Sequence, residues 1–234
     1  GAFFSKCMNG AMPDLLRFVC AILIGAAMAA LFGFLIGIPV LRLKGDYLAI
    51  VTLGFGEIIK NLVNVFYVGR DSEGFHFSMK DAMSLNMLED GEVIIKGAQG
   101  ITKTPQDSNF TIGVILLLIA LFIVLNFINS RSGRAVMAIR DNRIAAESVG
   151  INITKYKLLG FSISAAIAGA GGVLYAHNLY TLSATPSTFG YTMSILILVY
   201  VVLGGIGSFR GSIISTAVLI ILPELLRPIA DYRM

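Results

Sequence analysis

The stretch FTIGVILLLIALFIVLNF, residues 110–127, carries no charged side chain over its 18 positions. A helix that crosses the hydrocarbon core of a bilayer needs about 20 predominantly apolar residues. A surface helix of a soluble protein would instead present polar residues along one face at helical spacing. This stretch has no such face, so it predicts a membrane-spanning helix.

The composition of the whole chain agrees with this prediction. Of its 234 residues, 56% are hydrophobic and only 14% are charged, and the mean hydropathy is +0.81. Soluble domains carry roughly 25% charged residues, so this chain has too few to cover a soluble surface. We therefore expect one transmembrane domain over residues 1–234, an all-α integral membrane protein built as a polytopic helical bundle.

Five further apolar runs flank the first one and bring the expected number of spans or partial spans to about six. They lie at residues 19–41, 47–67, 158–176, 191–207 and 213–226. The chain starts with a short mixed stretch and ends directly after the last run. We therefore expect a fragment of a longer protein that lacks spans at both ends.

The charges of the connecting segments predict the orientation of these spans. Residues 130–157 carry six Lys or Arg and two acids, whereas residues 69–109 carry four Lys or Arg and seven acids. Short loops rich in Lys and Arg remain cytoplasmic. The loop 130–157 is therefore predicted to be cytoplasmic and the acidic segment 69–109 external. Alternation then places 42–46 and 205–211 inside and 178–190 outside.

The middle of the loop 130–157 predicts a short helix. Two stripes lie at helical spacing: Arg134, Ala138, Asp141 and Ala145, and beside them Ala135, Ile139, Asn142 and Ala146. Gly150 would end this helix as its C′ residue. The small residues on one face allow a partner to approach closely, so the helix could transmit force from a soluble protein. It could equally be an amphipathic helix that only anchors to lipid headgroups.

Three blocks of the sequence resemble a known family. They are LRLKGDYLAIVTLGFGEIIKNLVN (41–64), SGRAVMAIRDNRIAAESVGINITKYKLLGFSISAAIAGAGGVLYA (132–176) and ILVYVVLGGIGSFRGSIISTAVLIILPELLR (197–227). Together they are similar to the permease subunits of bacterial branched-chain amino acid ABC importers. The pattern GRAxxAIRDNxxAAxxxGI in the second block is the most specific part of the resemblance.

The resemblance implies a multi-pass protein of the bacterial cytoplasmic (inner) membrane, surrounded by membrane lipid. It also implies a second permease subunit, two cytoplasmic ABC ATPase subunits and an external solute-binding protein that delivers leucine, isoleucine or valine. The chain would then have no cofactor and no catalytic site, because ATP hydrolysis belongs to the partner. The loop would be the ATPase-coupling region, with contact candidates Gly133, Arg134, Ala135, Arg140, Asp141, Asn142, Ala145, Ala146 and Gly150.

A translocation path is expected where glycines break the spans, because free backbone groups are tolerated there only if they line a cavity. The segments LGFGE (53–57) and LGGIGS (203–208) give the candidates Gly54, Gly56, Glu57, Gly204, Gly205 and Gly207. Glu57 could line the path or pair with Lys60 three residues on. A further set of small residues is expected to form close helix–helix contacts instead: Ala165, Ala168, Gly169, Gly171 and Gly172.

Several other activities are excluded by missing patterns. The chain has no phosphate-binding GxxxxGK[ST] loop, no HExxH helix and no aspartate within a predicted span, which excludes an ATPase, a metalloprotease and an intramembrane aspartyl protease. The competing function is a secondary transporter driven by an ion gradient, with Glu57 as the ion or proton site. A purely structural scaffold is the third alternative. A secondary transporter does not need the loop pattern, and a scaffold would keep its activity after deletion of residues 133–150.

Overall fold

The computed structural model describes residues 1–8, 13–43, 46–71, 74–80, 92–102, 104–183, 185, 189–205 and 207–231. Two compact units form within the chain, residues 1–183 and 184–234. Four of the seven acids in the predicted external segment lie outside the described residues: Glu73, Asp81, Glu89 and Asp90.

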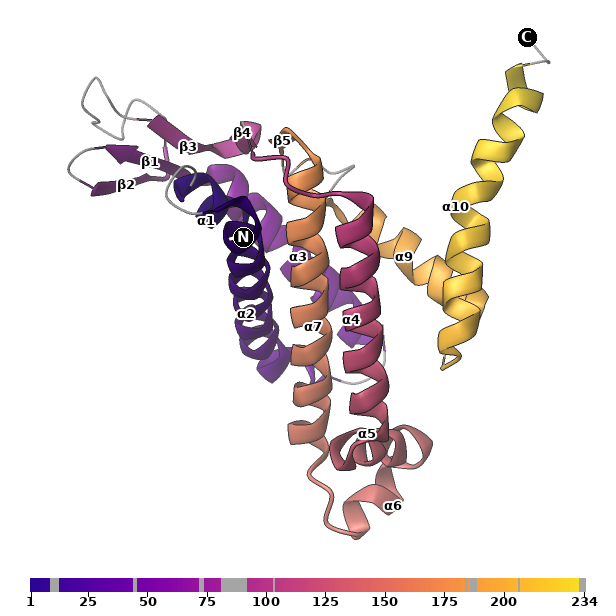
Figure 1. Cartoon of the computed structure of the whole chain (residues 1–234). Coiled ribbons are helices and arrows are strands. Elements are labelled where there is room, and N and C mark those ends of the chain that lie inside the picture. Colours follow the sequence, from indigo (N-terminus) through magenta and orange to yellow (C-terminus); the bar gives the residue numbers. More distant parts are fainter. Residues whose placement is uncertain are drawn as a thin grey trace. The chain divides into compact units, whose positions relative to one another are not determined.

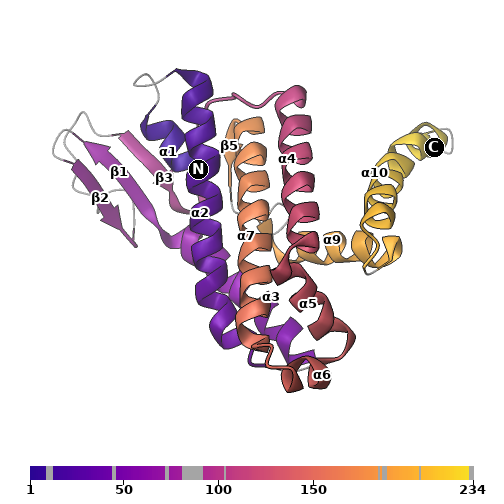
Figure 2. The same cartoon turned by 60° about the horizontal axis from the view of Figure 1, so that its bottom comes forward.

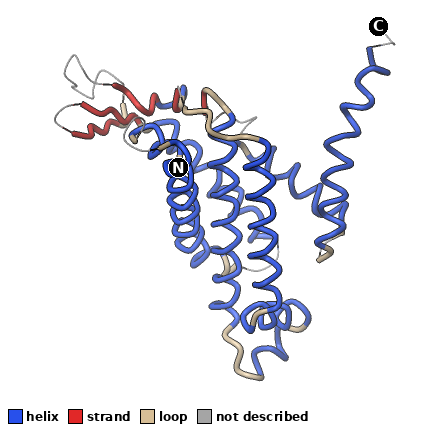
Figure 3. The backbone as a smooth tube through the Cα atoms, viewed as in Figure 1, coloured by secondary structure: helices blue, strands red, loops and turns tan. Residues whose placement is uncertain are grey.

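Helices occupy all six ranges where spans are predicted (Figure 3). They are α2 (Asp14–Val40), α3 (Asp46–Val65), α4 (Phe110–Asn129), α7 (Ile153–Asn178), α9 (Tyr191–Gly204) and α10 (Phe209–Asp231). Among the described residues, α2, α4 and α7 are long and apolar enough to cross a membrane, and α9 is apolar but has 14 residues. The expected polytopic helical architecture is therefore confirmed.

Three of these helices begin about one turn before the apolar runs that predicted them, among them α10, which starts at Phe209 rather than at residue 213. α2 starts at Asp14 rather than at residue 19, and α7 starts at Ile153 rather than at residue 158. The side chain of Asn152 caps α7 by accepting a hydrogen bond from the backbone N–H of Lys155 at 3.0 Å, as capping residues do at helix starts. Hydropathy locates the apolar part of a helix, whereas its ends are decided by caps and ion pairs.

α2 and α7 pack against each other in antiparallel directions, so that Gly37 lies beside Leu158 and Gly25 lies beside Val173 (Figures 1 and 2). Small residues allow this close approach. An added Cβ at Gly169 would lie 2.4 Å from the Cβ of Ala29. The predicted helix-packing role of Gly169 is therefore confirmed.

The small residues of α7 do not all serve that contact. Ala165 contacts α2 as predicted, because an added Cβ at Gly33 would lie 2.6 Å from its Cβ. Gly171 and Gly172 have no atom within 4 Å of an added Cβ. Within the residues that the structure describes, the prediction of close packing at these two glycines is therefore wrong.

A five-stranded sheet is the element that the sequence analysis did not anticipate. Its strand order is β2-β1-β3-β4-β5, and the pairs are antiparallel. The strands are β1 (Tyr67–Asp71), β2 (Gly74–Ser78), β3 (Glu92–Lys96), β4 (Ile101–Thr102) and β5 (Thr181–Leu182). The predicted external segment 69–109 therefore contributes residues to four of the five strands.

The sheet joins the two predicted external segments. Strand β4 pairs with β5 through Ile101↔Leu182 and Thr102↔Thr181. The pairing needs glycine at position 100, where φ is +70° and an added Cβ would lie 1.8 Å from the Leu182 carbonyl oxygen. Sheet and helices consequently meet at one end of the first unit, which we call the sheet end.

Two polar contacts fasten the sheet end to the helices. Thr104 is buried, and its hydroxyl donates to the carbonyl oxygens of Leu179 and Tyr180 at the end of α7. Arg17 of α2 is also buried and forms an ion pair with Asp107 at 2.7 Å. Buried charges are stable only when they are paired, so this contact fixes the segment that leads into α4.

Replacing Asp107 with asparagine should lower the free energy of unfolding by about 1–2 kcal/mol, because Arg17 would lose its charged acceptor in a buried position. Asp14 provides a matched control, since its carboxylate also contacts Arg17, at 3.1 Å, but is 80% exposed. Asp14→Asn should change stability by less than about 0.5 kcal/mol. Thermal unfolding in detergent measures both changes in stability. Equal losses for the two variants would contradict a specific stabilising role of the ion pair between Arg17 and Asp107.

The second unit contains α9 and α10 joined by a tight turn. Helix α9 ends at Gly204, and both Gly205 and Gly207 adopt positive φ, +91° and +98°. An added Cβ at Gly211 would lie 1.9 Å from the carbonyl oxygen of Gly204. The hydroxyl of Ser215 also donates to the carbonyl oxygen of Tyr200 at 2.9 Å. The backbones of α9 and α10 therefore approach each other here more closely than a residue with a Cβ would allow.

Candidate functional site

The predicted coupling loop forms two short helices at the end of α4 and α7 that lies opposite the sheet (Figures 1 and 2). They are α5 (Arg131–Asp141) and α6 (Arg143–Ser148), and we call residues 131–148 the elbow. Ser130 separates α4 from α5 and caps α5 by accepting a hydrogen bond from the Gly133 N–H at 3.1 Å. The elbow is therefore held to α4 without a flexible linker.

The junction between α4 and α5 depends on Gly133. An added Cβ there would lie 2.0 Å from the carbonyl oxygen of Phe127 and 2.6 Å from that of Ile128. These are backbone atoms of the last turn of α4, so no side-chain rotation can relieve the contact. The first turn of α5 consequently sits directly against the end of the span, and a displacement of one should displace the other.

The elbow bends at Asn142, where the chain leaves the helical conformation with φ −152° and ψ 105°. The Oδ1 atom of Asn142 accepts hydrogen bonds from the backbone N–H groups of Ile144 and Ala145, each at 3.1 Å. The prediction of one helix through this region was therefore wrong. Asparagine is a strong N-cap residue, and here its capping interaction starts a second helix.

The end of the elbow matches the prediction for Gly150. This residue has φ +83°, its N–H donates to the Glu147 carbonyl at 3.0 Å, and the N–H of Ile151 donates to the Ala146 carbonyl at 3.1 Å. These two bonds form a Schellman motif, in which glycine at C′ is favoured because it adopts positive φ without strain. Gly150 is confirmed as the C′ residue, and its role is to terminate the helix.

One face of the elbow packs against its own chain. Ile139 and Ala146 form a buried cluster with Ile153 at the start of α7, and Ile151 and Tyr156 pack against them. Ala135 and Gly133 are buried as well. The small-residue stripe therefore packs against its own chain here, and Gly133, Ala135 and Ala146 are buried.

The remaining coupling candidates lie on the exposed side: Arg134, Arg140, Asp141, Asn142, Ala145 and Gly150. Arg140 donates to the Oδ1 atom of Asp141 through Nε at 3.1 Å and Nη2 at 3.0 Å, and both side chains are about two-thirds exposed. Two exposed apolar side chains in the same loop were not predicted, Ile144 and Val149, at 81% and 74% exposure. The feature of the sequence that could have indicated them is an apolar residue within an otherwise polar loop.

The first predicted path segment, residues 53–57, does not interrupt a helix. Helix α3 continues from Asp46 to Val65, so the expected break at Gly54 and Gly56 was wrong, because a helix tolerates single glycines at modest cost. Glu57 forms an ion pair with Lys60 one turn further on. The two glycines lie on nearly opposite sides of α3, and neither has an atom within 4 Å of an added Cβ.

The second predicted path segment, residues 203–208, does interrupt the helical path and forms the turn between α9 and α10. Gly204 makes the close backbone contact there, while Gly205 and Gly207 supply the positive φ angles. The structure gives these glycines a local conformational role. They belong to the second unit, whereas Glu57 belongs to the first.

The described residues contain no group of three or more His, Cys, Asp and Glu side chains that could hold a metal ion. His177 is buried, with Nδ1 2.9 Å from the Val173 carbonyl oxygen and its ring 5.0 Å from that of Phe18 in an edge-on arrangement. This histidine therefore packs within the helix contact at the sheet end.

Apolar helices of span length, with large hydrophobic side chains exposed along them, define an integral membrane protein of the polytopic helical class. Residues 1–233 match the family described as branched-chain amino acid transport system, permease component. The chain belongs to this family, as the resemblance of its three sequence blocks implied.

Curated relatives of the chain are membrane permeases. It is 37% identical over 224 residues to the high-affinity branched-chain amino acid transport system permease protein LivM of Salmonella typhimurium, covering 92% of this chain and 52% of the relative. LivM of Escherichia coli is 36% identical over 220 residues, covering 90% and 51%. The fructose import permease protein FruG of Bifidobacterium longum is 25% identical over 225 residues, covering 94% and 62%.

The chain thus spans about half the length of the LivM proteins that it matches. No solved structure shows significant similarity to it.

Proposed function

We propose that this chain is the membrane-spanning permease subunit of an ATP-driven importer of branched-chain amino acids. The observation that carries the proposal is the elbow, which is built directly onto the ends of two spans and presents charged and apolar side chains away from them. A gradient-driven transporter has no need of such a surface. The matched family and the LivM relatives support the same assignment.

The proposed partners are two cytoplasmic ABC ATPase subunits, an external solute-binding protein and a second permease subunit, in the bacterial inner membrane. The elbow end would face the cytoplasm, because basic residues are concentrated in 130–157. The sheet end would face outward. The pairing of β4 with β5 supports this orientation, because it brings both predicted external segments to one end.

Coupling would proceed through the elbow. The ATPases close on ATP and displace the exposed side around Arg140 and Asp141. The displacement reaches α4 through the contact at Gly133 and reaches α7 through the cluster of Ile139, Ala146 and Ile153. The spans then expose the path alternately to each side. Coupling free energies are reciprocal, so loaded binding protein outside should in turn raise the ATPase rate inside.

The path itself is proposed to pass α3 and the turn between α9 and α10. On α3 the residues would be Gly54, Gly56 and Glu57, and the ion pair with Lys60 keeps the carboxylate neutralised within the span. In the second unit, Gly204, Gly205 and Gly207 would act as a hinge. The family includes relatives named for fructose import, so selection of the amino acid is assigned to the external binding protein.

Leucine uptake by liposomes that contain the complete permease and its partners tests this function. We expect uptake to require internal ATP, and an imposed ion gradient alone should not support it. An Arg140→Ala, Asp141→Ala double variant should take up leucine severalfold more slowly while inserting normally, because the exposed docking pair is lost. Uptake driven by the gradient without ATP, and unaffected by the double variant, would refute the proposal and make Glu57 the centre of the mechanism.

A further inference from the structure

The second half of α3 carries a strip of polar side chains. They are spaced three or four positions apart, which places them on one face of the helix: Glu57, Lys60, Asn61 and Asn64. We call these four residues the polar strip. The other side of the same half is apolar and exposed: Ile58, Ile59, Leu62 and Val63. This half of α3 is therefore amphipathic.

The polar strip starts at the sheet end and leads toward the middle of the helix. The carbonyl oxygen of Asn64 lies 2.9 Å from the position that an added Cβ would take at Gly97, in the short 3₁₀ helix η2 (Gly97–Gln99) between β3 and β4. Glu57 lies seven residues before Asn64, which is about 10 Å along the axis at 1.5 Å per residue. If the sheet end faces outward, as proposed above, the strip leads from the outer surface into the span.

The inner end of the polar strip is the ion pair between Glu57 and Lys60. The side chain of Lys60 is 11% exposed and that of Glu57 is 31% exposed, so both charges are largely withdrawn from solvent. An ion pair in such a place contributes little stability, because the cost of desolvating the two charges offsets their attraction. Ionisable residues within membrane spans are accordingly rare and mark functional sites. The pair therefore suggests a role in transport.

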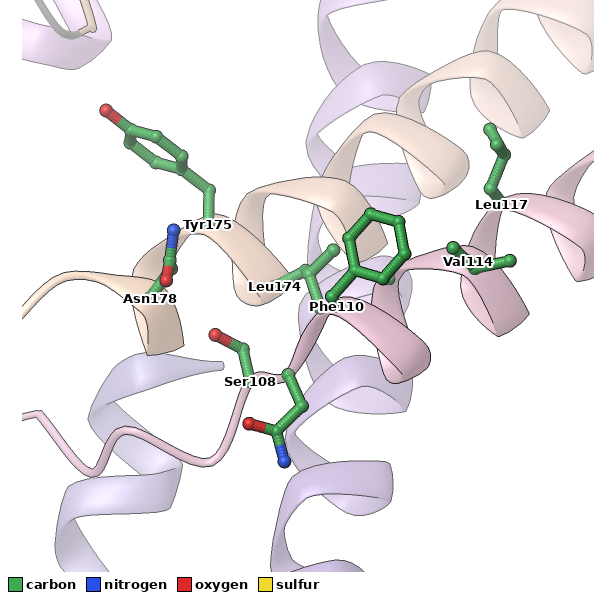
Figure 4. A pocket seen from close by; sticks show the side chains of 9 residues that line it. Ser108, Phe110, Val114, Leu117, Leu174, Tyr175 and Asn178 are labelled. Carbon is green, nitrogen blue, oxygen red and sulfur yellow. The ribbon is translucent and has the colours of Figure 1, made fainter.

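The hollow between α4 and α7 at the sheet end offers no comparable chemistry. It has a volume of about 430 Å³, and the side chains that line it carry hydroxyl, amide and apolar groups without charge (Figure 4). A neutral α-amino acid has an ammonium and a carboxylate on one carbon atom, and each needs a partner of opposite charge when it leaves water. On α3, Glu57 and Lys60 provide one such partner for each group.

We propose that the pair of Glu57 and Lys60 binds the ammonium and the carboxylate of a neutral α-amino acid on its way through the membrane. The Glu57 carboxylate accepts hydrogen bonds from the substrate ammonium, and the Lys60 ammonium donates to the substrate carboxylate. The amides of Asn61 and Asn64 line the approach from the sheet end. This site rests on the proposed function, to which it adds a substrate class.

The charges explain how one site can serve several amino acids. The pair and the zwitterionic substrate each have zero net charge, so binding adds no net charge to the interior of the membrane. The pair contacts only the two groups that all such amino acids share. It therefore recognises the class and leaves the choice of side chain to the external binding protein.

Binding of three compounds with the same branched carbon chain tests the site: leucine, 4-methylpentanoate, which lacks the ammonium, and 3-methylbutylamine, which lacks the carboxylate. Equilibrium dialysis of each radiolabelled compound gives its Kd for the complete permease with its ATPases in detergent, without binding protein and without ATP. We expect the wild type to bind leucine at least about tenfold more tightly than either analogue, because each analogue loses one set of charge-assisted hydrogen bonds.

Single substitutions should change these preferences in opposite directions. Glu57→Gln removes the carboxylate beside Lys60, so 4-methylpentanoate should bind at least as tightly as leucine. Lys60→Met removes the cation beside Glu57, so 3-methylbutylamine should bind at least as tightly as leucine. Glu224→Gln is the matched control, because Glu224 pairs with Arg227 at the same spacing, at 3.4 Å, but the two side chains are 76% and 72% exposed. It should leave all three affinities within about twofold of the wild type.

The double variant Glu57→Gln, Lys60→Met decides the matter if a single variant unfolds. Replacing both members of a buried ion pair by neutral residues is often neutral for stability or stabilising, and the double variant should bind leucine at least about tenfold more weakly than the wild type. Equal affinities of the wild type for the three compounds, undetectable leucine binding, or full leucine affinity in the double variant would overturn the site. If uptake by the wild type still needs ATP, such a result leaves the proposed function standing, whereas gradient-driven uptake overturns that function itself.

Discussion

Replacing Gly133 with alanine is expected to reduce ATP-driven leucine uptake by about tenfold to a hundredfold. The new Cβ would lie 2.0 Å from the Phe127 carbonyl oxygen, so α5 must move away from the end of α4. Overpacking of this kind costs about 1–3 kcal/mol. Here the steric clash is relieved when the elbow moves away from the end of α4. The separation uncouples the ATPases from α4, whereas the spans still insert. Uptake by liposomes, normalised to the amount of inserted permease, measures the effect.

Gly160→Ala is the control for this substitution. Gly160 also lies in a helix, α7, but an added Cβ there meets no atom within 4 Å, so uptake should remain within about twofold of the wild type. The rate of ATP hydrolysis provides a second measurement. In Gly133→Ala it should no longer rise when loaded binding protein is added, because coupling is reciprocal. Normal uptake in Gly133→Ala would show that the α4–α5 junction does not transmit the motion.

The helices of this protein could be predicted from the sequence because the membrane imposes a simple rule. A span must be apolar for about 20 residues, and the run at 110–127 returns as α4 (Phe110–Asn129) with a difference of two residues. The rule says nothing about where a helix ends outside the hydrocarbon. The predicted run began at residue 19, after Arg17, whose ion pair with Asp107 spans 90 positions of the chain, so no local pattern reveals it.

The sheet could not be predicted for a similar reason. Strands β4 and β5 are two residues each, too short to show an alternating pattern, and they pair across about 80 residues. The elbow was predicted as one helix with a small-residue face; the face is present, but Asn142 divides the helix into α5 and α6. Its orientation could not be read from periodicity, because a stripe of Ala135 and Ala146 suits an intramolecular contact as well as a docked partner. In the structure, Ala146 packs against Ile153 at the start of α7.

Replacing Gly169 with valine is expected to lower the free energy of unfolding by about 3 kcal/mol or more. Its Cβ would lie 2.4 Å from the Cβ of Ala29 and 2.8 Å from the carbonyl oxygen of Gly25, and the second of these is a backbone atom that cannot rotate away. α2 and α7 would have to separate, and each would lose van der Waals contacts along its length. In a membrane those contacts are the main force between helices. Thermal unfolding of the complete permease in detergent measures the loss.

Two variants show whether close packing is the cause. Gly172→Val places the same side chain three residues further along α7, where an added Cβ meets no atom within 4 Å, and it should change stability by less than about 1 kcal/mol. At a second point of contact, Gly33→Ala would place its Cβ 2.6 Å from that of Ala165, with every other atom at 3.9 Å or more. Adding Ala165→Gly should therefore restore most of the stability that Gly33→Ala removes, as a double-mutant cycle detects. If the losses of stability caused by Gly33→Ala and Ala165→Gly were additive in the double variant, α2 and α7 would be held together by something other than the fit of their small residues.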